Sequence, residues 1–230
     1  AFGVTLLLVV FFGLRETNKF RSDKVDLGAL LRGSGEMLRS RRFLGHILPL
    51  GFGFAINFGM LAGVPFILQE RLGFTPQEFG LIVLLSVGGF TLGTFVNNRL
   101  VGRVSPTAII RHAGWFHVAA LAVMAALSLS GVLAWWASIG PHMLLSFGTG
   151  LMVAVANAGA VGMFPRLAGT ASSIAGLAQM GMGAMGTVTV AALSLVGSRY
   201  VAMPLVIGLL PFAFAMLLSG RLLRPAGMAR

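Results

Sequence analysis

The stretch FLGHILPLGFGFAINFGMLAGVPFILQ, residues 43–69, contains no Asp, Glu, Lys or Arg. An apolar run of about 20 residues is long enough to cross the hydrocarbon core of a bilayer as a helix. The run is continuously apolar and lacks the two-residue alternation of a membrane barrel strand. Because a segment in lipid must satisfy its own backbone polar groups, such a run forms a helix. This stretch therefore predicts an all-α membrane protein.

The same pattern recurs along the chain, which predicts a transmembrane bundle of six helices. The other uncharged runs are 79–98, 112–165, 167–198 and 200–220. The run 112–165 holds the end of one span and the whole of another, with a turn between Ser130 and Trp136. The six predicted spans are 44–68, 79–101, 106–129, 134–158, 168–195 and 200–221.

The remaining segments complete the predicted organisation of the chain. Residues 1–14 are expected to be the end of a preceding transmembrane helix whose start is missing. Residues 15–42 are expected to form a cytoplasmic loop, in which 27–42 is a weak amphipathic helix along the membrane surface or, alternatively, a plain linker. The six-helix bundle would occupy 43–222, and a cytoplasmic tail would occupy 223–230.

Composition and charge agree with a membrane protein. Hydrophobic residues make up 57% of the chain and charged residues 10%, against about 25% charged in soluble domains. This composition argues against a soluble or disordered protein. The net charge of +11 does not indicate a nucleic-acid partner, because all but two of the 17 basic residues, Arg71 and Arg199, fall on one predicted side of the membrane. Basic loops mark the cytoplasmic side, so the C-terminus is expected to be cytoplasmic.

Several short motifs along the chain have the order and spacing found in a known protein family. They are RRF at 41–43, GVPFILQ at 63–69, LGFTPQEFG at 72–80, NRLVGR at 98–103, Asn157-Ala158, Pro165, AGTASS at 168–173, Gly176 and Gln179. Together they resemble the C-terminal half of a major facilitator superfamily transporter, and most closely the Bcr/CflA group of drug:proton antiporters. The basic turn of Asn98, Arg99 and Arg103 departs from the fuller superfamily form, since no aspartate precedes Arg99.

The resemblance implies a protein of twelve helices, in which two six-helix halves rock around a central cavity. Residues 1–14 would end the sixth helix, and the missing N-terminal half would be a partner of this chain. That half would carry the proton-titrating acids, and the proton gradient, rather than a cofactor, would supply energy. The implied function is proton-coupled efflux of small lipophilic drugs or metabolites across a bacterial inner membrane, with this fragment inactive alone.

Polar and aromatic side chains within the spans are candidates for the substrate cavity. Amides orient a ligand, while Phe and Met side chains give adaptable apolar contacts. The alternative role for the amides is hydrogen bonding between helices. The cavity candidates are Phe54, Asn57, Phe58, Asn157, Gln179 and Met180.

Glycines at regular spacing are candidates for close helix packing or for sliding between the halves. Two GxxxG motifs are present, and a further stripe of small residues lies along one face of the fifth span. The packing candidates are Gly59, Gly63, Gly89, Gly93, Gly176, Gly183 and Gly186.

The sequence offers no catalytic residues and no metal site. The four histidines have no other His, Asp or Glu at ligand spacing on their own helices. An intramembrane protease needs a nucleophilic serine motif inside a span, and the nearest match, residues 33–35, lies in the cytoplasmic loop. An enzyme is therefore not expected. The alternatives to an exporter are a non-transporting membrane scaffold, a truncated half-transporter, and a transporter that takes up a metabolite.

Overall fold

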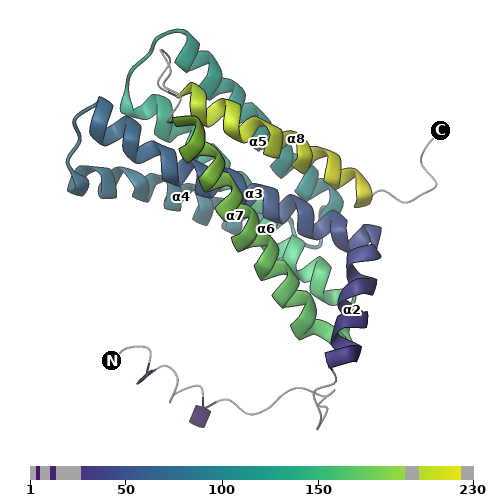
Figure 1. Cartoon of the computed structure of the whole chain (residues 1–230). Coiled ribbons are helices and arrows are strands. Elements are labelled where there is room, and N and C mark those ends of the chain that lie inside the picture. The colour runs from purple at the N-terminus through teal and green to yellow at the C-terminus, as the bar shows by residue number, and fades with distance from the viewer. Residues whose placement is uncertain (1–3, 6–10, 14–26, 195–201, 224–230) are drawn as a thin grey trace, which may run out of the picture.

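The computed structural model describes residues 4–5, 11–13, 27–194 and 202–223 (Figure 1). The α-helices are α2 (Leu27–Arg39), α3 (Arg41–Pro65), α4 (Pro76–Leu100), α5 (Pro106–Leu129), α6 (Trp135–Gly162), α7 (Ala168–Ser194) and α8 (Met203–Gly220). Short helical turns occur at η1 (Phe66–Arg71), η2 (Pro165–Leu167) and η3 (Arg221–Leu223). No strand occurs in these ranges, which confirms the all-α prediction.

Six of the helical segments are long and apolar enough to span a membrane, as predicted. The first two spans begin three residues earlier than predicted, at Arg41 and Pro76, and the largest differences at C-terminal ends occur in two spans. The first span continues through η1 to Arg71, where a wide π-type turn follows Pro65 and the Leu72 amide donates to Ile67 O. The fourth span continues to Gly162, because no charge or proline occurs between Ala158 and Pro165.

Some predicted segments lie wholly or partly outside the described residues. These are most of 1–14, all of 15–26, the junction 195–201 and the tail from 224. The division of the chain into a preceding helix, a loop, a bundle and a tail therefore stays a prediction.

Helix starts follow local rules of N-terminal capping. The side chains of Ser40, Thr75 and Ser105 each accept a hydrogen bond from a backbone amide three residues later. At Thr75 the cap is reciprocal, because the Glu78 carboxylate accepts from the Thr75 backbone amide at 2.8 Å. Such caps satisfy backbone donors that the helix leaves free and thereby fix where each span begins.

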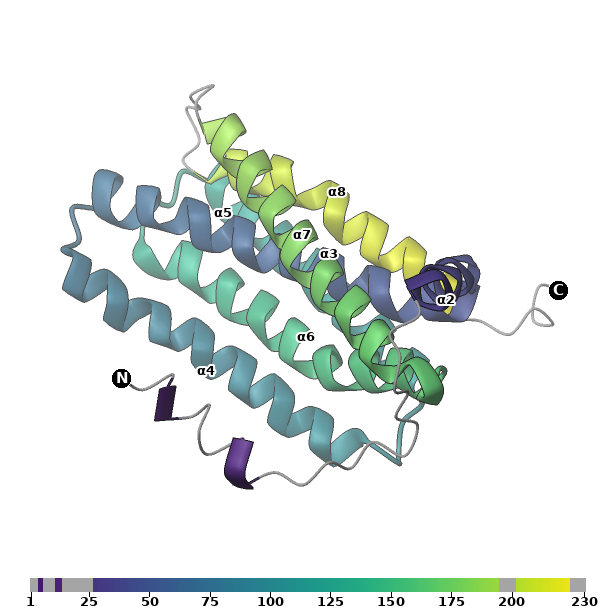
Figure 2. The same ribbon diagram turned by 60° about the horizontal axis from the view of Figure 1, so that its bottom comes forward.

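The six long helices form a bundle in which α3 and α6 are central (Figures 1 and 2). Helix α7 packs along α3 and α4 packs along α6, while α5 packs against α6, and α8 packs against α3 and α5. In the most apolar window of each span, 61% of residues are buried in α3 and 50% in α6, but only 17% in α4 and 22% in α7. Helices α4 and α7 therefore present most of their surface to lipid or to a partner.

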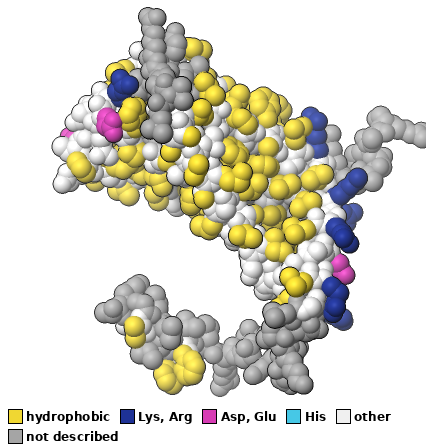
Figure 3. Space-filling view, in the orientation of Figure 1, with side chains coloured by type: hydrophobic (Ala, Val, Ile, Leu, Met, Phe, Trp, Pro, Cys, Tyr) yellow, Lys and Arg dark blue, Asp and Glu magenta, His cyan; other side chains and the backbone are white. Residues whose placement is uncertain are grey.

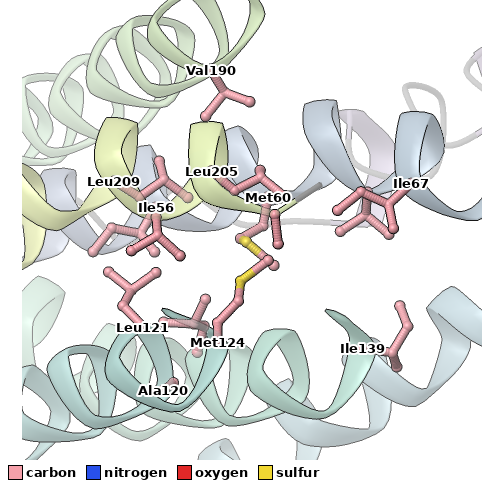
Figure 4. Close-up of a cluster of buried hydrophobic side chains, with 14 of the residues drawn as sticks. Ile56, Met60, Ile67, Ala120, Leu121, Met124, Ile139, Val190, Leu205 and Leu209 are labelled. Carbon is pink, nitrogen blue, oxygen red and sulfur yellow. The ribbon is translucent and has the colours of Figure 1, made fainter. Parts of the chain in front are cut away.

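Two clusters of buried apolar side chains hold the bundle together. One lies between α3, α5 and α8, where Ile56, Met60, Met124 and Leu209 meet (Figure 4). The other lies nearer α2 and contains the fully buried Phe43. Because lipid tails are as apolar as these side chains, close packing rather than removal from water stabilises the contacts.

Helix α2 lies across one end of the bundle (Figure 1). Met37 is fully buried, whereas Leu31 and Leu38 are 74% and 52% exposed. Among the described residues, every arginine except Arg71 belongs to α2 or to the helix ends on the same side, where Figure 3 shows basic side chains gathered. The predicted location of α2 along a membrane surface and the cytoplasmic orientation of this end stay predictions.

Candidate functional site

A groove of about 290 Å³ opens between α3, α4 and α6. It contains no Asp, Glu, Lys or Arg. Its walls combine aromatic rings, branched aliphatic side chains and small polar groups. The lining residues are Phe54, Asn57, Phe58, Leu61, Val83, Ser86, Val87, Phe90, His142, Ser146 and Thr149.

Helical spacing explains why these side chains share one groove. Phe54, Phe58 and Leu61 follow one another at intervals of four and three residues, which places them on one face of α3. His142, Ser146 and Thr149 repeat the same intervals on α6. Because Asn57 of α3 bonds to Ser146 and Thr149 of α6, these faces meet along the groove.

Asn57 is the centre of a hydrogen-bond network that joins α3 to α6. Its amide nitrogen donates to Gly53 O at 3.1 Å and to Thr149 Oγ1 at 2.5 Å. Its amide oxygen accepts from Ser146 Oγ at 2.9 Å. Both amide hydrogens and the oxygen are therefore used, and the amide orientation is fixed at the groove wall.

The network continues to α5 through a histidine behind the groove. His117 is fully buried, and its Nε2 lies 3.1 Å from Thr149 Oγ1. Its Nδ1 lies 2.7 Å from Ala113 O. One hydroxyl group, that of Thr149, therefore connects a buried imidazole with the amide of Asn57.

A second polar pair crosses the groove between α4 and α6. Ser86 Oγ lies 3.1 Å from His142 Nδ1, and both side chains are buried. On α3, the rings of Phe54 and Phe58, which also line the groove, meet edge to face with centroids 5.8 Å apart. The groove thus combines hydrogen-bonding groups with aromatic rings, an arrangement suited to a small, largely apolar molecule with a few polar atoms.

The structure brings together only part of the predicted cavity set. Phe54, Asn57 and Phe58 line the groove, but Asn157 and Gln179 form a separate pair between α6 and α7, with an Nε2–Oδ1 distance of 3.5 Å. Met180 is 56% exposed on α7. A cavity role for these last three residues stays a prediction.

Most of the predicted packing glycines lie at close helix contacts. A Cβ atom at Gly89 would approach Met143 O to 2.5 Å, and one at Gly93 would collide with Phe147 O. Gly150 of α6 reciprocates, because a Cβ there would collide with Phe90 O. Helices α4 and α6 thus cross backbone against backbone.

The contacts of α3 show the same use of glycine, with one difference. On α3, a Cβ at Gly59 would lie 2.5 Å from Leu209, and one at Gly63 would collide with Leu205. On α7, a Cβ at Gly183 would lie 2.6 Å from Phe58, and one at Gly186 would collide with Ala55 O. Gly176 differs, since a Cβ there would meet no described atom within 4 Å. The stripe on α7 therefore packs on α3 only in its second half.

The basic turn after α4 is exposed to its surroundings. Asn98, Arg99 and Arg103 are all exposed, and the Arg99 guanidinium carbon lies 4.8 Å from the centroid of the Phe95 ring. The neighbouring Asn97 is fully buried against α6, and neither its amide nitrogen nor its oxygen has a hydrogen-bond partner among the described residues.

Replacement of Asn97 by leucine is expected to raise the thermal unfolding midpoint of the purified chain in detergent. A buried polar group without a partner costs about 1–3 kcal/mol, and leucine of similar size removes that cost. Asn98→Leu is the matched control and should leave the midpoint unchanged, because Asn98 is exposed. A lower midpoint for Asn97→Leu would contradict the prediction and would show that the amide makes a hydrogen bond.

Several groove residues escaped prediction from the sequence. Ser86, His142, Ser146, Thr149 and, behind them, His117 all take part in hydrogen bonds across helices. The signal that could have found three of them is the spacing of 142, 146 and 149, which puts polar groups on one face of a span. For His142 and His117 the sequence shows only that no other metal-ligating residue lies at ligand spacing on their own helices.

Comparisons with known proteins agree with this architecture. The family model described as Major Facilitator Superfamily matches residues 1–187. The multidrug transporter MdfA of Edwardsiella ictaluri is 33% identical over 159 residues, which cover 67% of this chain and 38% of that protein.

Two further relatives are more distant. MdfA of Yersinia pestis (strain Angola) is 29% identical over 147 residues, which cover 64% of this chain and 35% of that protein. The MFS-type transporter YdgK of Bacillus subtilis is 27% identical over 130 residues, which cover 55% of this chain and 32% of that protein. The matched segments thus span about a third of the length of these relatives. With a family model matched over most of its length and six helices able to span a membrane, the chain belongs to the major facilitator superfamily of membrane transporters.

Proposed function

We propose that this chain is the C-terminal six-helix half of a proton-coupled exporter of small lipophilic molecules, of the Bcr/CflA type. The single observation that carries the proposal is the uncharged groove between α3, α4 and α6, with its aromatic and hydrogen-bonding side chains. The MdfA relatives are named multidrug transporters, which supports a drug-like substrate.

The groove is suited to weakly specific recognition. Aromatic rings accept many apolar shapes, while a few fixed polar groups orient whatever enters. Since the groove holds no charged side chain, it imposes no single charge on its ligand. The energy source in this proposal is the proton gradient, and the acids that titrate would lie in the N-terminal half.

The remaining parts of the proposal concern the partner and the membrane. A second six-helix half would cover the exposed faces of α4 and α7, and the chain alone would be inactive because one half encloses no two-sided cavity. The membrane would be a bacterial inner membrane. The end that carries α2 and most of the basic residues would face the cytoplasm, together with the C-terminus.

A dye-accumulation assay tests the proposal with the complete protein that contains this chain. Cells that produce it should accumulate less of a lipophilic fluorescent dye, and a proton uncoupler should abolish the difference. Phe54→Ala should impair export, since Phe54 lines the groove. The matched control is Phe116→Ala, which also removes one edge-to-face aromatic pair, at 5.2 Å from Phe147, but lies outside the groove.

Two results would contradict the proposal. Export that an uncoupler does not change would exclude proton coupling. Equal activity of the Phe54→Ala and Phe116→Ala variants would exclude the groove as the substrate path.

A further inference from the structure

His117 is a buried titratable side chain to which the proposed function gives no part. It lies on α5, outside the groove lining, and is fully buried. Its ring packs against α6, where a Cβ at Gly148 would lie 2.8 Å from the ring. On the α3 side, a Cβ at Gly53 would lie 3.9 Å from Nε2. The ring is thus enclosed by α3, α5 and α6.

The hydrogen bonds of His117 define the positions of its hydrogens. Ala113 O can only accept, so Nδ1 carries a hydrogen and donates it across 2.7 Å. In the neutral ring Nε2 then has a free lone pair. The Thr149 hydroxyl, 3.1 Å away, can donate its hydrogen to this lone pair in place of Leu145 O.

The same atoms also satisfy the protonated ring. When Nε2 carries a second hydrogen, it donates to Thr149 Oγ1, and the Thr149 hydrogen turns to Leu145 O at 3.1 Å. Thr149 Oγ1 can meanwhile still accept from Asn57, because an sp³ oxygen has two lone pairs. Rotation of one hydroxyl therefore accommodates both states without movement of a heavy atom.

No charged group faces His117 from the helices around it. Within the spans of α3, α6 and α8, the residues 43–65, 135–162 and 203–220 contain no Asp, Glu, Lys or Arg. On α5 itself the only charged side chain is Arg111, near the α2 end and exposed. The nearest other titratable group on α6 is His142, seven residues or about two helical turns from Thr149.

We infer that His117 is a proton-binding site in this half of the transporter, and that a proton on it weakens the binding of cationic molecules in the groove. The inference rests on the proposed function, since it takes the groove as a substrate site. A single hydroxyl separates the imidazole from Asn57 at the groove wall, and the groove offers no acidic side chain to offset a positive charge behind it. His117 is thus a positioning residue, which acts on the ligand through Thr149 and through its charge.

Equilibrium binding of tetraphenylphosphonium to the complete transporter in detergent tests the inference. The affinity should fall as the solution is acidified from about pH 8 to about pH 4, a range that covers histidine titration in exposed and buried settings. The expected contribution of His117 is a fall of roughly tenfold, the size of a charge–charge repulsion inside a protein. In His117→Gln, which stays neutral, this contribution should be absent.

Two further variants separate a proton site from a merely structural residue. Thr149→Val keeps the side-chain shape but removes the hydroxyl, so the midpoint of the fall should move even if His117→Gln does not fold. His112→Gln is the matched control, because His112 lies on the same helix with its ring nitrogen 2.7 Å from a carbonyl four residues earlier, but is exposed. It should keep the wild-type pH profile.

The outcomes distinguish this inference from the proposed function. An unchanged pH profile in both His117→Gln and Thr149→Val, with binding and export intact, would overturn the proton site alone. Absence of binding of both tetraphenylphosphonium and the uncharged dye N-phenyl-1-naphthylamine would overturn the proposed function instead. A fall in affinity of equal size for the uncharged dye would also overturn the inference, because the repulsion acts only on a cation.

Discussion

Replacement of Gly93 by leucine is expected to separate α4 from α6 and to unfold the purified chain at a markedly lower temperature in detergent. A Cβ atom at this position would collide with Phe147 O, and Leu151 N would lie at 2.9 Å. These are backbone atoms, which cannot rotate away as a flexible side chain can. The cost should be about 3 kcal/mol or more, at the upper end of the range for overpacking.

Gly88→Leu is the control for this experiment. It lies on the same helix, and a Cβ there would meet no described atom within 4 Å. Its thermal unfolding midpoint should match that of the unmodified chain. Equal midpoints for the Gly93 and Gly88 variants would show that the close crossing of α4 and α6 is wrong.

Replacement of Asn57 by leucine should destabilise the bundle and abolish dye binding. The variant loses bonds to Gly53 O, Thr149 and Ser146, and leaves the Ser146 hydroxyl without its acceptor. A polar group left unpaired costs about 1–3 kcal/mol, which exceeds the average of about 0.6 kcal/mol for one hydrogen bond between membrane helices. Thermal unfolding of the chain and binding of N-phenyl-1-naphthylamine to the complete transporter measure the two effects.

Asn157→Leu provides the comparison. Asn157 donates to Val153 O at 3.0 Å on its own helix, and its contact with Gln179 is long at 3.5 Å. It should therefore cost less stability than Asn57→Leu. If the two variants have the same midpoint, Asn57 is not the centre of a network between helices.

The number and type of helices could be predicted from the sequence because charge is costly inside a bilayer. Charged residues lie between the apolar runs, so the uncharged segments mark the membrane-spanning helices. The predicted first span ends at Leu68 because the charged Glu70 and Arg71 follow, whereas the helix continues through these residues to Arg71. Membership in a transporter family also confirms that the chain is not an enzyme.

The candidate site was predictable only on the helix where its residues are close in sequence. Phe54, Asn57 and Phe58 lie within five positions of one another, and their spacing defines a face. Asn57 meets Thr149 across 92 positions, and spacing along one helix does not identify which neighbour will face it. For the same reason Asn157 and Gln179 were grouped with Asn57 although the structure places them in a separate pair.

The hydrogen bonds around Thr149 have a consequence for how this half can move. Apolar side chains in a lipid-embedded bundle exchange one contact for a similar one when helices slide, so they set the vertical register of the helices only weakly. Asn57, His117 and Thr149 fix α3, α5 and α6 at one common level. We therefore expect the three helices to tilt together as one rigid unit. Bending of α3 is then expected away from Asn57, near Pro49 toward one end or at the wide turn after Pro65 at the other.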